Sequence, residues 1–591
     1  GTLVVNGVVS TATGNLLTGS TVITNLNSVT GLTVGMQVQQ GNTYFPARTV
    51  ITAIGATAPT ATATQTVLGT DLPVSSTVGF VVGMPITGTN IPANTIIAAV
   101  NANSLTLNTA TTVLAVAGVT GTKSVTVSNA VTGTLAGSAL TFGNAYNGGT
   151  LINGGTLVIR DNFSLGNVGD AVTVASGATL DFGGSLTANA LNLGTRIVTI
   201  AGAGVGGNGA IVNSGGFGQI NAVQALVLSG DASIGGTQRW DFRGPASATL
   251  ALNEYTLTKT GSNYIALANA DVSLGNLVVN GGTLEVSGST TSILAGVLAN
   301  TNNATITINT GATLLLNGTS SFSFTRDLVM AGGTLVSTNL ASSIGSNALL
   351  SAPTVMNTNG SDLTLTGVVS GSGLLSKVGG NILNLNGINT FTGGLTVSAG
   401  IVATNNDASF GTGTVTLPSG GTGRVNLAGG FTYTNNFVIG SGAGQANVTG
   451  NVGLGLINHA GSGRATITGS LSVLNLTSAG GMLLGGALGN ELVLAGPISI
   501  AAGVDLTIRL GNVIMSGGGD VAGANIRLQQ GNLFAGANEG IPAHTKLELG
   551  ASGAAVLDLA GFNQTLSALT KGAQAATVTN SMAGGVTSTL S

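Results

Sequence analysis

Few residues in this chain carry side chains that could act as acids, bases or metal ligands. The 591 residues include no Cys, two His, 15 Lys or Arg and 18 Asp or Glu. A Ser-His-Asp triad would need one of the two histidines beside an ordered carboxylate. His459 lies in an Asn-His-Ala-Gly sequence and His544 follows Pro542 and Ala543, so both are predicted to lie in surface turns. We therefore expect neither histidine to be catalytic.

Pairs of carboxylates are the second chemistry to consider. Glycoside hydrolysis needs two carboxyl groups about 5–10 Å apart. Asp161, Asp170 and Asp181 follow one another at unequal intervals, which does not place them on one face of a repeating fold. The chain has no His-Glu-x-x-His motif and no Cys for a thiolate zinc site. We predict no catalytic residue, no metal and no cofactor.

The densest group of charged and aromatic residues is Arg-Trp-Asp-Phe-Arg at residues 239–243. Successive side chains of a strand point to opposite faces. Arg239, Asp241 and Arg243 would then share one face, and the two aromatic rings the other. The simplest interpretation is an exposed ion pair over buried aromatic rings. The alternative is a contact with a sugar or a protein partner through Arg239, Trp240, Asp241 and Arg243.

Short strands are the elements that would position these residues. Charged residues make up 6% of the chain, yet the hydrophobic share of 43% argues against disorder. Runs such as residues 305–309 and 504–510 alternate apolar with polar residues, and Gly or Asn closes them. Apolar residues at helical spacing are missing. Since no helices are predicted, another sheet must cover the apolar face of each strand.

Internal repeats indicate how the strands are arranged. Lys259 and Gly261 recur at the same spacing as Lys377 and Gly379, and the Ser-Leu-Gly at residues 164–166 matches Ser-Phe-Gly at 409–411. Units that repeat in this way stack on one another and share a continuous core. We predict an all-β fold, a right-handed parallel β-helix (β-solenoid). Rungs of roughly 20 residues would give about 23 rungs over residues 129–591.

The first part of the chain repeats differently. Gly-Leu-Thr-Val-Gly-Met at residues 31–36 matches Gly-Phe-Val-Val-Gly-Met at 79–84, and residues 46–51 match 92–97. This pattern predicts a tandem pair of small inserted β modules. The predicted organisation is a start of the solenoid or connecting strand at residues 1–19, the modules at 20–128 and solenoid repeats at 129–591.

Charge and hydropathy exclude two classes of partner. The net charge is −3 and the basic residues are scattered, whereas nucleic-acid binding requires Lys and Arg on one face. The longest uncharged run, between Asp71 and Lys123, contains Pro73, Pro85 and Pro92. A membrane-spanning helix needs about 20 consecutive apolar residues. We expect no nucleic-acid binding and no membrane insertion of this segment.

Two stretches resemble a known repeat. Residues 371–387, followed by Asn-Thr-Phe-Thr-Gly-Gly at 389–394, are similar to the autotransporter-associated β-strand repeat, and so are residues 555–566 with the Ile-Pro-Ala at 541–543. The similarity covers roughly residues 140–180 and 250–591. It implies a β-helical passenger region of a bacterial surface protein, such as an extracellular stalk or adhesin.

Both termini of the sequence read as solenoid strands. Residues 1–7 resemble the sequence from Gly282 onwards, and residues 586–591 stop partway into a strand. Solenoid ends need caps that prevent pairing with other chains. We expect either a longer protein or copies that associate end to end.

These patterns together favour a non-enzymatic structural or adhesive protein that is extracellular or on the bacterial cell surface. Its expected partners are copies of itself, as in a filament, and host or matrix surface glycans. A carbohydrate-binding or carbohydrate-cleaving β-helix is the alternative. A third hypothesis is a display stalk whose modules at residues 20–128 bind the partner.

Overall fold

The structure is a computed structural model of residues 1–591. It describes all of them except residues 6–7, 41–43, 47–48, 65–68, 112–117, 144–147, 167–169, 274, 289–303, 319–322, 325, 441–456, 460–461, 475–481, 487–489, 522 and 583–585. The fold is nearly all β, with parallel strands stacked as a β-solenoid of about 17 turns and small antiparallel sheets near the N-terminus. Two compact units divide the chain, Gly1–Gly244 and Pro245–Ser591. The predicted β-solenoid with inserted modules is therefore confirmed.

The antiparallel sheets of the first unit form the predicted modules. One module packs a core that includes Ile23, Met36 and Phe142, and the second a core that includes Phe80 and Met84. The strands of these sheets are β2 (Val8–Leu16), β3 (Val22–Ile23), β4 (Gln37–Gln39), β5 (Ile51–Gly55), β6 (Thr60–Thr62), β7 (Asp71–Pro73), β8 (Ile97–Val100), β9 (Ser104–Leu107), β10 (Gly118–Thr120), β11 (Ser124–Val127) and β12 (Leu135–Gly143). Because β2 pairs antiparallel with β12, the modules extend beyond residues 20–128 on both sides.

The sequence repeat between the modules is a repeat of backbone contacts. The N–H of Gly35 donates to the carbonyl of Ile51 at 2.8 Å, and the N–H of Gly83 donates to that of Ile97 at 2.7 Å. Both glycines have a positive φ, 94° and 81°, which favours glycine in each copy. Ala47 and Arg48, which belong to the second matched stretch, lie outside the described residues.

A Pro-Ala-x-Thr turn closes part of each repeat and recurs in the solenoid. The hydroxyl of Thr49 donates to the carbonyl of Pro46 at 2.6 Å, and that of Thr95 to Pro92 at 2.7 Å. The same contact, Thr545 to the carbonyl of Pro542 at 2.7 Å, follows the Ile-Pro-Ala of the second unit. Each threonine therefore satisfies a carbonyl inside its own turn.

Parallel strands make up the rest of the first unit. They are β1 (Thr2–Val5), β13 (Thr150–Ile152), β14 (Gly155–Ile159), β15 (Val172–Val174), β16 (Ala178–Asp181), β17 (Ile197–Gly202), β18 (Ile211–Asn213), β19 (Gln219–Val223), β20 (Ala225–Gly236) and the first residues of β21 (Trp240–Ala251), with 3-10 turns at Phe182–Gly184 and Val205–Gly207. The first strand pairs with β14, Thr2 opposite Thr156. Parallel pairing continues from β17 to β20 and from β19 to β21, so residues 185–242 carry on the solenoid.

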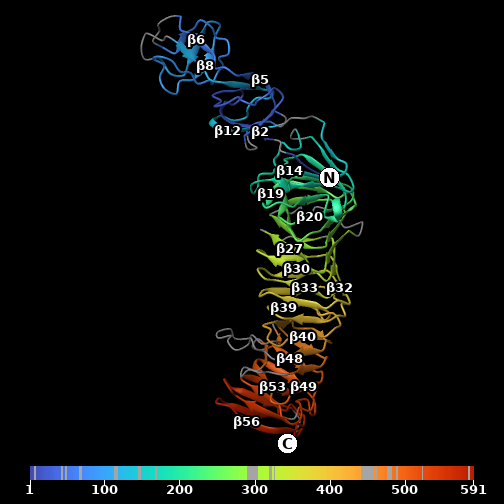
Figure 1. Cartoon of the computed structure of the whole chain (residues 1–591). Coiled ribbons are helices and arrows are strands. Elements are labelled where there is room, and N and C mark those ends of the chain that lie inside the picture. The colour runs from blue at the N-terminus through green and yellow to red at the C-terminus, as the bar shows by residue number, and fades with distance from the viewer. Residues whose placement is uncertain are drawn as a thin grey trace. The chain divides into compact units, whose positions relative to one another are not determined.

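The second unit is a stack of parallel strands, which Figure 1 shows from β27 and β30 to β53 and β56. One sheet contains β22 (Thr256–Lys259), β23 (Tyr264–Val272), β24 (Asn276–Val279), β25 (Gly282–Gly288), β26 (Thr305–Asn309), β27 (Ala312–Gly318), β29 (Asp327–Ala331), β30 (Thr334–Thr338), β32 (Ala348–Ala352), β33 (Thr354–Asn357), β35 (Val369–Gly371), β36 (Leu375–Val378), β38 (Leu395–Val397), β40 (Val415–Leu417), β43 (Phe437–Ile439), β46 (Leu471–Val473) and β49 (Ile498–Ile500).

Two further sheets complete the second unit. The longer contains β28 (Ser323–Phe324), β31 (Ser342–Ile344), β34 (Leu363–Leu365), β37 (Ile382–Leu385), β39 (Ile401–Thr404), β41 (Arg424–Leu427), β44 (Ile457–His459), β47 (Met482–Gly486), β50 (Asp505–Leu510), β52 (Asn525–Leu528), β54 (Thr545–Leu549) and β56 (Leu566–Lys571). The shorter contains β42 (Thr432–Tyr433), β45 (Arg464–Ile467), β48 (Glu491–Leu494), β51 (Asn512–Met515), β53 (Gly531–Ala535), β55 (Ala555–Asp558) and β57 (Ala576–Thr579).

Rungs vary in length, and the number of rungs predicted from the sequence was therefore too high. Leu395 pairs with Val415 in the next rung, whereas Phe437 pairs with Leu471, which lies much further along the chain. The longer rungs leave about 17 turns in the solenoid. Inward residues such as Leu395 are buried, because each strand needs its apolar face covered by its neighbours.

Candidate functional site

The predicted alternation at residues 239–243 is present in β21. Trp240 and Phe242 point into the first unit and are fully buried. The Trp240 ring meets Phe182 edge-on at 5.5 Å between centroids and Phe242 at 5.1 Å, and its indole N–H donates to the carbonyl of Gly235 at 2.9 Å. These contacts anchor the strand that carries the neighbouring charged residues.

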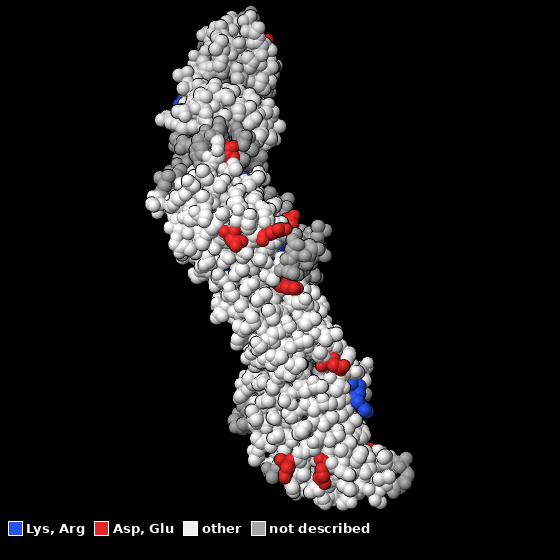
Figure 2. Space-filling model, turned by 90° about the vertical axis from the view of Figure 1, so that its right-hand side faces the viewer, with Lys and Arg blue, Asp and Glu red and all other residues white. Residues whose placement is uncertain are grey.

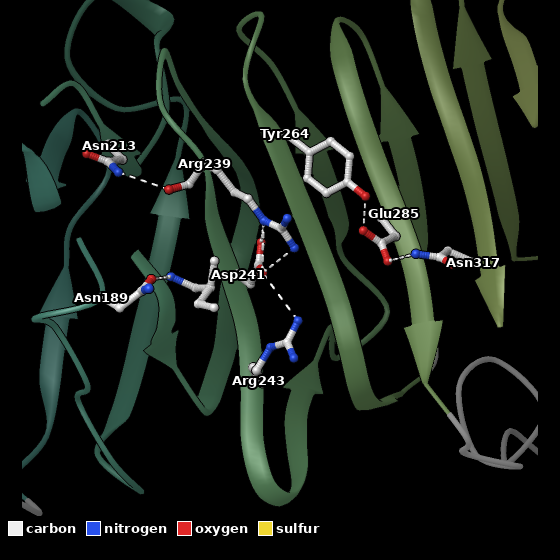
Figure 3. Close-up of polar contacts among 9 residues, drawn as sticks. Asn189, Asn213, Arg239, Asp241, Arg243, Tyr264, Glu285 and Asn317 are labelled. Atoms are coloured by element: carbon white, nitrogen blue, oxygen red, sulfur yellow. Dashed lines mark hydrogen bonds and ion pairs between the residues drawn. The ribbon is translucent and has the colours of Figure 1, made fainter. Parts of the chain in front are cut away.

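Asp241 lies between two arginines (Figure 3). Arg239 donates to its carboxylate from Nε at 3.0 Å and from a terminal nitrogen at 2.8 Å, and a terminal nitrogen of Arg243 lies 3.6 Å away. The side chain of Asp241 has no exposed surface, whereas those of Arg239 and Arg243 are 38% and 39% exposed. Trp240 and Asp241 therefore cannot touch a partner at the surface, and the predicted partner contact is left to the two arginines.

A short loop of the same unit brings the backbone of Phe217 close to that of Arg239. Nδ2 of buried Asn213 donates at 3.0 Å to the carbonyl of Arg239 and at 3.0 Å to the carbonyl of Phe217. The Phe217 side chain is 46% exposed. Phe217 was not among the predicted contact residues, although a phenylalanine between glycines, Gly216 and Gly218, is the signal of an aromatic in a loop.

Glu285 is a second buried carboxylate on the solenoid, in the second unit (Figure 3). The hydroxyl of Tyr264 donates to one of its oxygens, and Nδ2 of Asn317 donates to the other at 2.8 Å. The three residues come from β23, β25 and β27 in successive rungs. This carboxylate therefore ties three rungs together.

The two histidines differ in environment. His544 is exposed and its Nδ1 lies 3.1 Å from Asp520, as expected for a surface turn. The prediction of a surface turn was wrong for His459, which is the last residue of β44 and is buried. Its register partner is the inward residue Leu427, and its ring nitrogens face the carbonyls of Leu427 and Gly463. Residues 460–461 lie outside the described residues.

Two buried lysines of the second unit lie near the ends of strands, Lys259 in β22 and Lys377 in β36. Nζ of Lys259 donates to the carbonyls of Thr260, Gly261 and Gly281 at 2.7, 3.0 and 2.9 Å. Nζ of Lys377 donates to those of Val378, Gly379 and Ala399 at 3.0, 2.7 and 2.9 Å. Burial lowers the pKa of each to about 8, and nearby Asp362 partly opposes this for Lys377. Three acceptors match the three N–H donors of an ammonium group.

Two buried arginines also donate hydrogen bonds to backbone carbonyls. Arg196 donates to the carbonyls of Leu165 and Gly166, and Arg326 to those of Ser273 and Gly275. Burial lowers the pKa of Arg326 to about 10, so it stays charged at neutral pH.

Asp181 holds two turns of the first unit together. Its Oδ1 accepts from the N–H groups of Gly183 and Ser214 at 2.8 and 3.0 Å, and its Oδ2 accepts from the Ser214 hydroxyl at 2.5 Å. Its oxygens are engaged in turns rather than directed at a shared site with Asp161, whose Oδ1 accepts from the N–H of Phe163 at 2.9 Å.

An open pocket of about 530 Å³ lies by β1, β13 and β14 of the first unit. Its lining residues include Thr2, Thr150, Thr156 and Ser164, together with Leu151 and Leu157. These residues offer hydrogen bonds and apolar contact, and none of the side chains named here can exchange a proton near neutral pH.

Within the described part of the chain, no group of three or more His, Asp or Glu lies together as metal ligands would. Over the same residues, no helix has the length and apolar character that crossing a bilayer requires.

Comparisons with known proteins assign no family to the chain. No family model, no curated protein and no solved structure matches the chain.

Proposed function

We propose that this chain is a non-enzymatic, extracellular structural or adhesive β-solenoid of a bacterial surface protein. The observation that carries the proposal is that buried Lys and Arg side chains of this weakly charged chain donate to its backbone. Lys259, Lys377, Arg196 and Arg326 all donate to backbone carbonyls of the solenoid. Catalytic groups need access to a substrate and a tuned proton affinity, whereas these groups hold the backbone of neighbouring rungs.

The outward surface supports the same proposal. Ser376, Thr396 and Thr416 stack in register on the outer face of three successive strands. Figure 2 shows a face on which acidic and basic residues are few. Hydroxyl-bearing and amide-bearing side chains of this kind suit strands and present hydrogen-bonding groups to a surface or matrix. The similarity to the autotransporter-associated repeat gives further support and suggests an extracellular location.

The alternative of carbohydrate cleavage has little support at the Arg239–Arg243 group. Cleavage needs two carboxyl groups that reach the glycosidic bond from opposite sides. Asp241 is fully buried and is held by Arg239, so it cannot reach a bound sugar. The carbohydrate-binding form of the alternative remains compatible with the two exposed arginines.

A polysaccharide panel tests the proposal. The purified chain is incubated with neutral and acidic plant, bacterial and matrix polysaccharides, and the retained protein and the newly formed reducing ends are both measured. We expect retention on at least one surface without new reducing ends above a heat-denatured control. A steady increase in reducing ends, or of unsaturated sugars, would show an enzyme and contradict the proposal.

A further inference from the structure

We propose that Arg239, Arg243 and Phe217 form a binding site for an acidic sugar, a glycan unit that carries a carboxylate. The inference rests on the proposed adhesive function and names the kind of ligand that one surface of the first unit would take. The guanidinium groups would bind the carboxylate, and the phenyl ring would pack against the apolar face of the sugar ring. Trp240, which the sequence suggested as a partner contact, is fully buried.

The buried aromatic rings make the two arginines a fixed pair. Arg239 and Arg243 are four residues apart on one face of an extended segment, so their Cα atoms are separated by about 13 Å. Both side chains converge on Asp241, which lies between them. Because Trp240 and Phe242 are held in the core, the backbone positions of the two arginines are set before a ligand arrives. Such preorganisation lowers the entropy cost of binding.

The charge of the group favours an anion. Asp241 is already held by hydrogen bonds from Arg239, so it compensates the positive charge of part-exposed Arg243 only weakly. The contact of Arg243 with Asp241 at 3.6 Å is longer than a hydrogen bond. Nε of Arg243 is buried, so a ligand cannot reach it. The terminal N–H groups of the part-exposed Arg243 side chain are then the donors that would meet a carboxylate, in the planar geometry that arginine prefers.

Phe217 supplies the apolar part of the site. Its carbonyl and that of Arg239 bind the same amide nitrogen of Asn213, so the two oxygens lie within about 6 Å of each other. The ring of Phe217 is 46% exposed, although an exposed aromatic ring loses the free energy that burial would provide. An aromatic face beside arginine donors matches a ligand with an apolar face and a negative charge.

Matched ligands and variants test the site. Binding of hexagalacturonate to the full chain is measured by titration calorimetry at pH 7, with the fully methyl-esterified hexasaccharide as the uncharged control. The variants are Arg243→Gln, Phe217→Ala and Asp241→Asn. Arg464→Gln is the control, because it removes one exposed, paired arginine of the second unit. Circular dichroism checks that each variant is folded.

We expect the wild-type chain to bind hexagalacturonate at least about tenfold more tightly than its methyl ester, because charged hydrogen bonds are lost with the charge. Arg243→Gln should weaken binding about tenfold and Phe217→Ala several-fold. Asp241→Asn should strengthen it, because both guanidinium groups lose their internal carboxylate. Equal binding of ester and acid, or wild-type affinity in Arg243→Gln and Phe217→Ala, would overturn the inference.

The same experiments distinguish failure of the acidic-sugar site from failure of the proposed function. If the wild-type chain ignores acidic sugars but is retained on another surface without forming reducing ends, this inference fails and the adhesive function stands. If hexagalacturonate is bound and cleaved, the ligand class holds and the non-enzymatic function fails.

Discussion

Lys259 and Lys377 occupy the same position in two rungs of the second unit, and each ammonium group donates to three backbone carbonyls. Two of the acceptors follow the lysine directly, and the third belongs to the next rung. The repeated contact explains why the sequence repeats a lysine at this position. Each lysine side chain therefore links the turn that follows it to the next rung.

Replacing either lysine should therefore weaken the solenoid. Lys259→Met or Lys377→Met removes the donors from three carbonyls and should lower the free energy of unfolding by about 3 kcal/mol. Lys546→Met, at an exposed position, should change it by less than about 0.5 kcal/mol. Urea unfolding followed by circular dichroism measures both. Equal stability of the buried and exposed variants would show that the three-carbonyl contact contributes nothing.

The same lysines should make stability depend on pH in the alkaline range. Their pKa in the folded chain, about 8, lies below the ordinary 10.5, so the unfolded chain holds more protons between these values. The free energy of unfolding should therefore rise from pH 8 to 10.5, by up to about 3 kcal/mol per lysine, and this gain is lost as the pH falls through 8. Unfolding at pH 7.5 and 10 measures it. Lys259→Met should show a smaller rise than the wild-type chain, and a parallel rise would refute the assignment.

Gly400 should tolerate no side chain. Its φ is 69°, and a Cβ would lie 2.3 Å from the carbonyl oxygen of Gly379 and 2.7 Å from Nζ of Lys377. Gly400→Ala should cost at least about 2 kcal/mol of unfolding free energy. The matched control is Gly380→Ala, since a Cβ there meets nothing within 4 Å. The outcome that counts against this packing is an equal thermal midpoint for the two variants.

Trp240 should be the anchor of β21 and not a ligand contact. As the single tryptophan, it should emit in the blue and resist acrylamide quenching in the folded chain. Trp240→Ala should destabilise the first unit by about 3–5 kcal/mol, whereas Phe217→Ala should stay within about 0.5 kcal/mol of the wild-type chain. Circular dichroism during urea unfolding compares them. A red emission maximum in the native chain would mean that the ring is exposed.

The repeats made most of the fold predictable from sequence. Strand alternation and the recurrence of Lys259 as Lys377 predicted stacked parallel strands, and the structure has them. Rung number was not predictable, because insertions such as the one between Phe437 and Leu471 lengthen a rung without breaking the register. The edges of the modules were also missed, since β2 and β12 carry no part of the tandem repeat.

The candidate site was predictable only in part. Alternation correctly separated the aromatic residues of β21 from the charged ones. It does not show that Asp241, although on the charged face of the strand, is fully buried. Nor does local sequence place Phe217 near Arg239, because a shared contact with Asn213 brings them together. His459 was misplaced because a histidine before Ala and Gly reads as a turn, whereas its register partner is the inward Leu427.

The proposed function is that of an extracellular structural or adhesive protein. Immunogold electron microscopy of the cells that make the protein tests it most directly, with an antibody raised against the second unit and permeabilised cells as the internal control. We predict gold particles on the outer surface of intact cells or in the surrounding matrix. Labelling that appears only after permeabilisation would place the chain inside the cell and contradict the account.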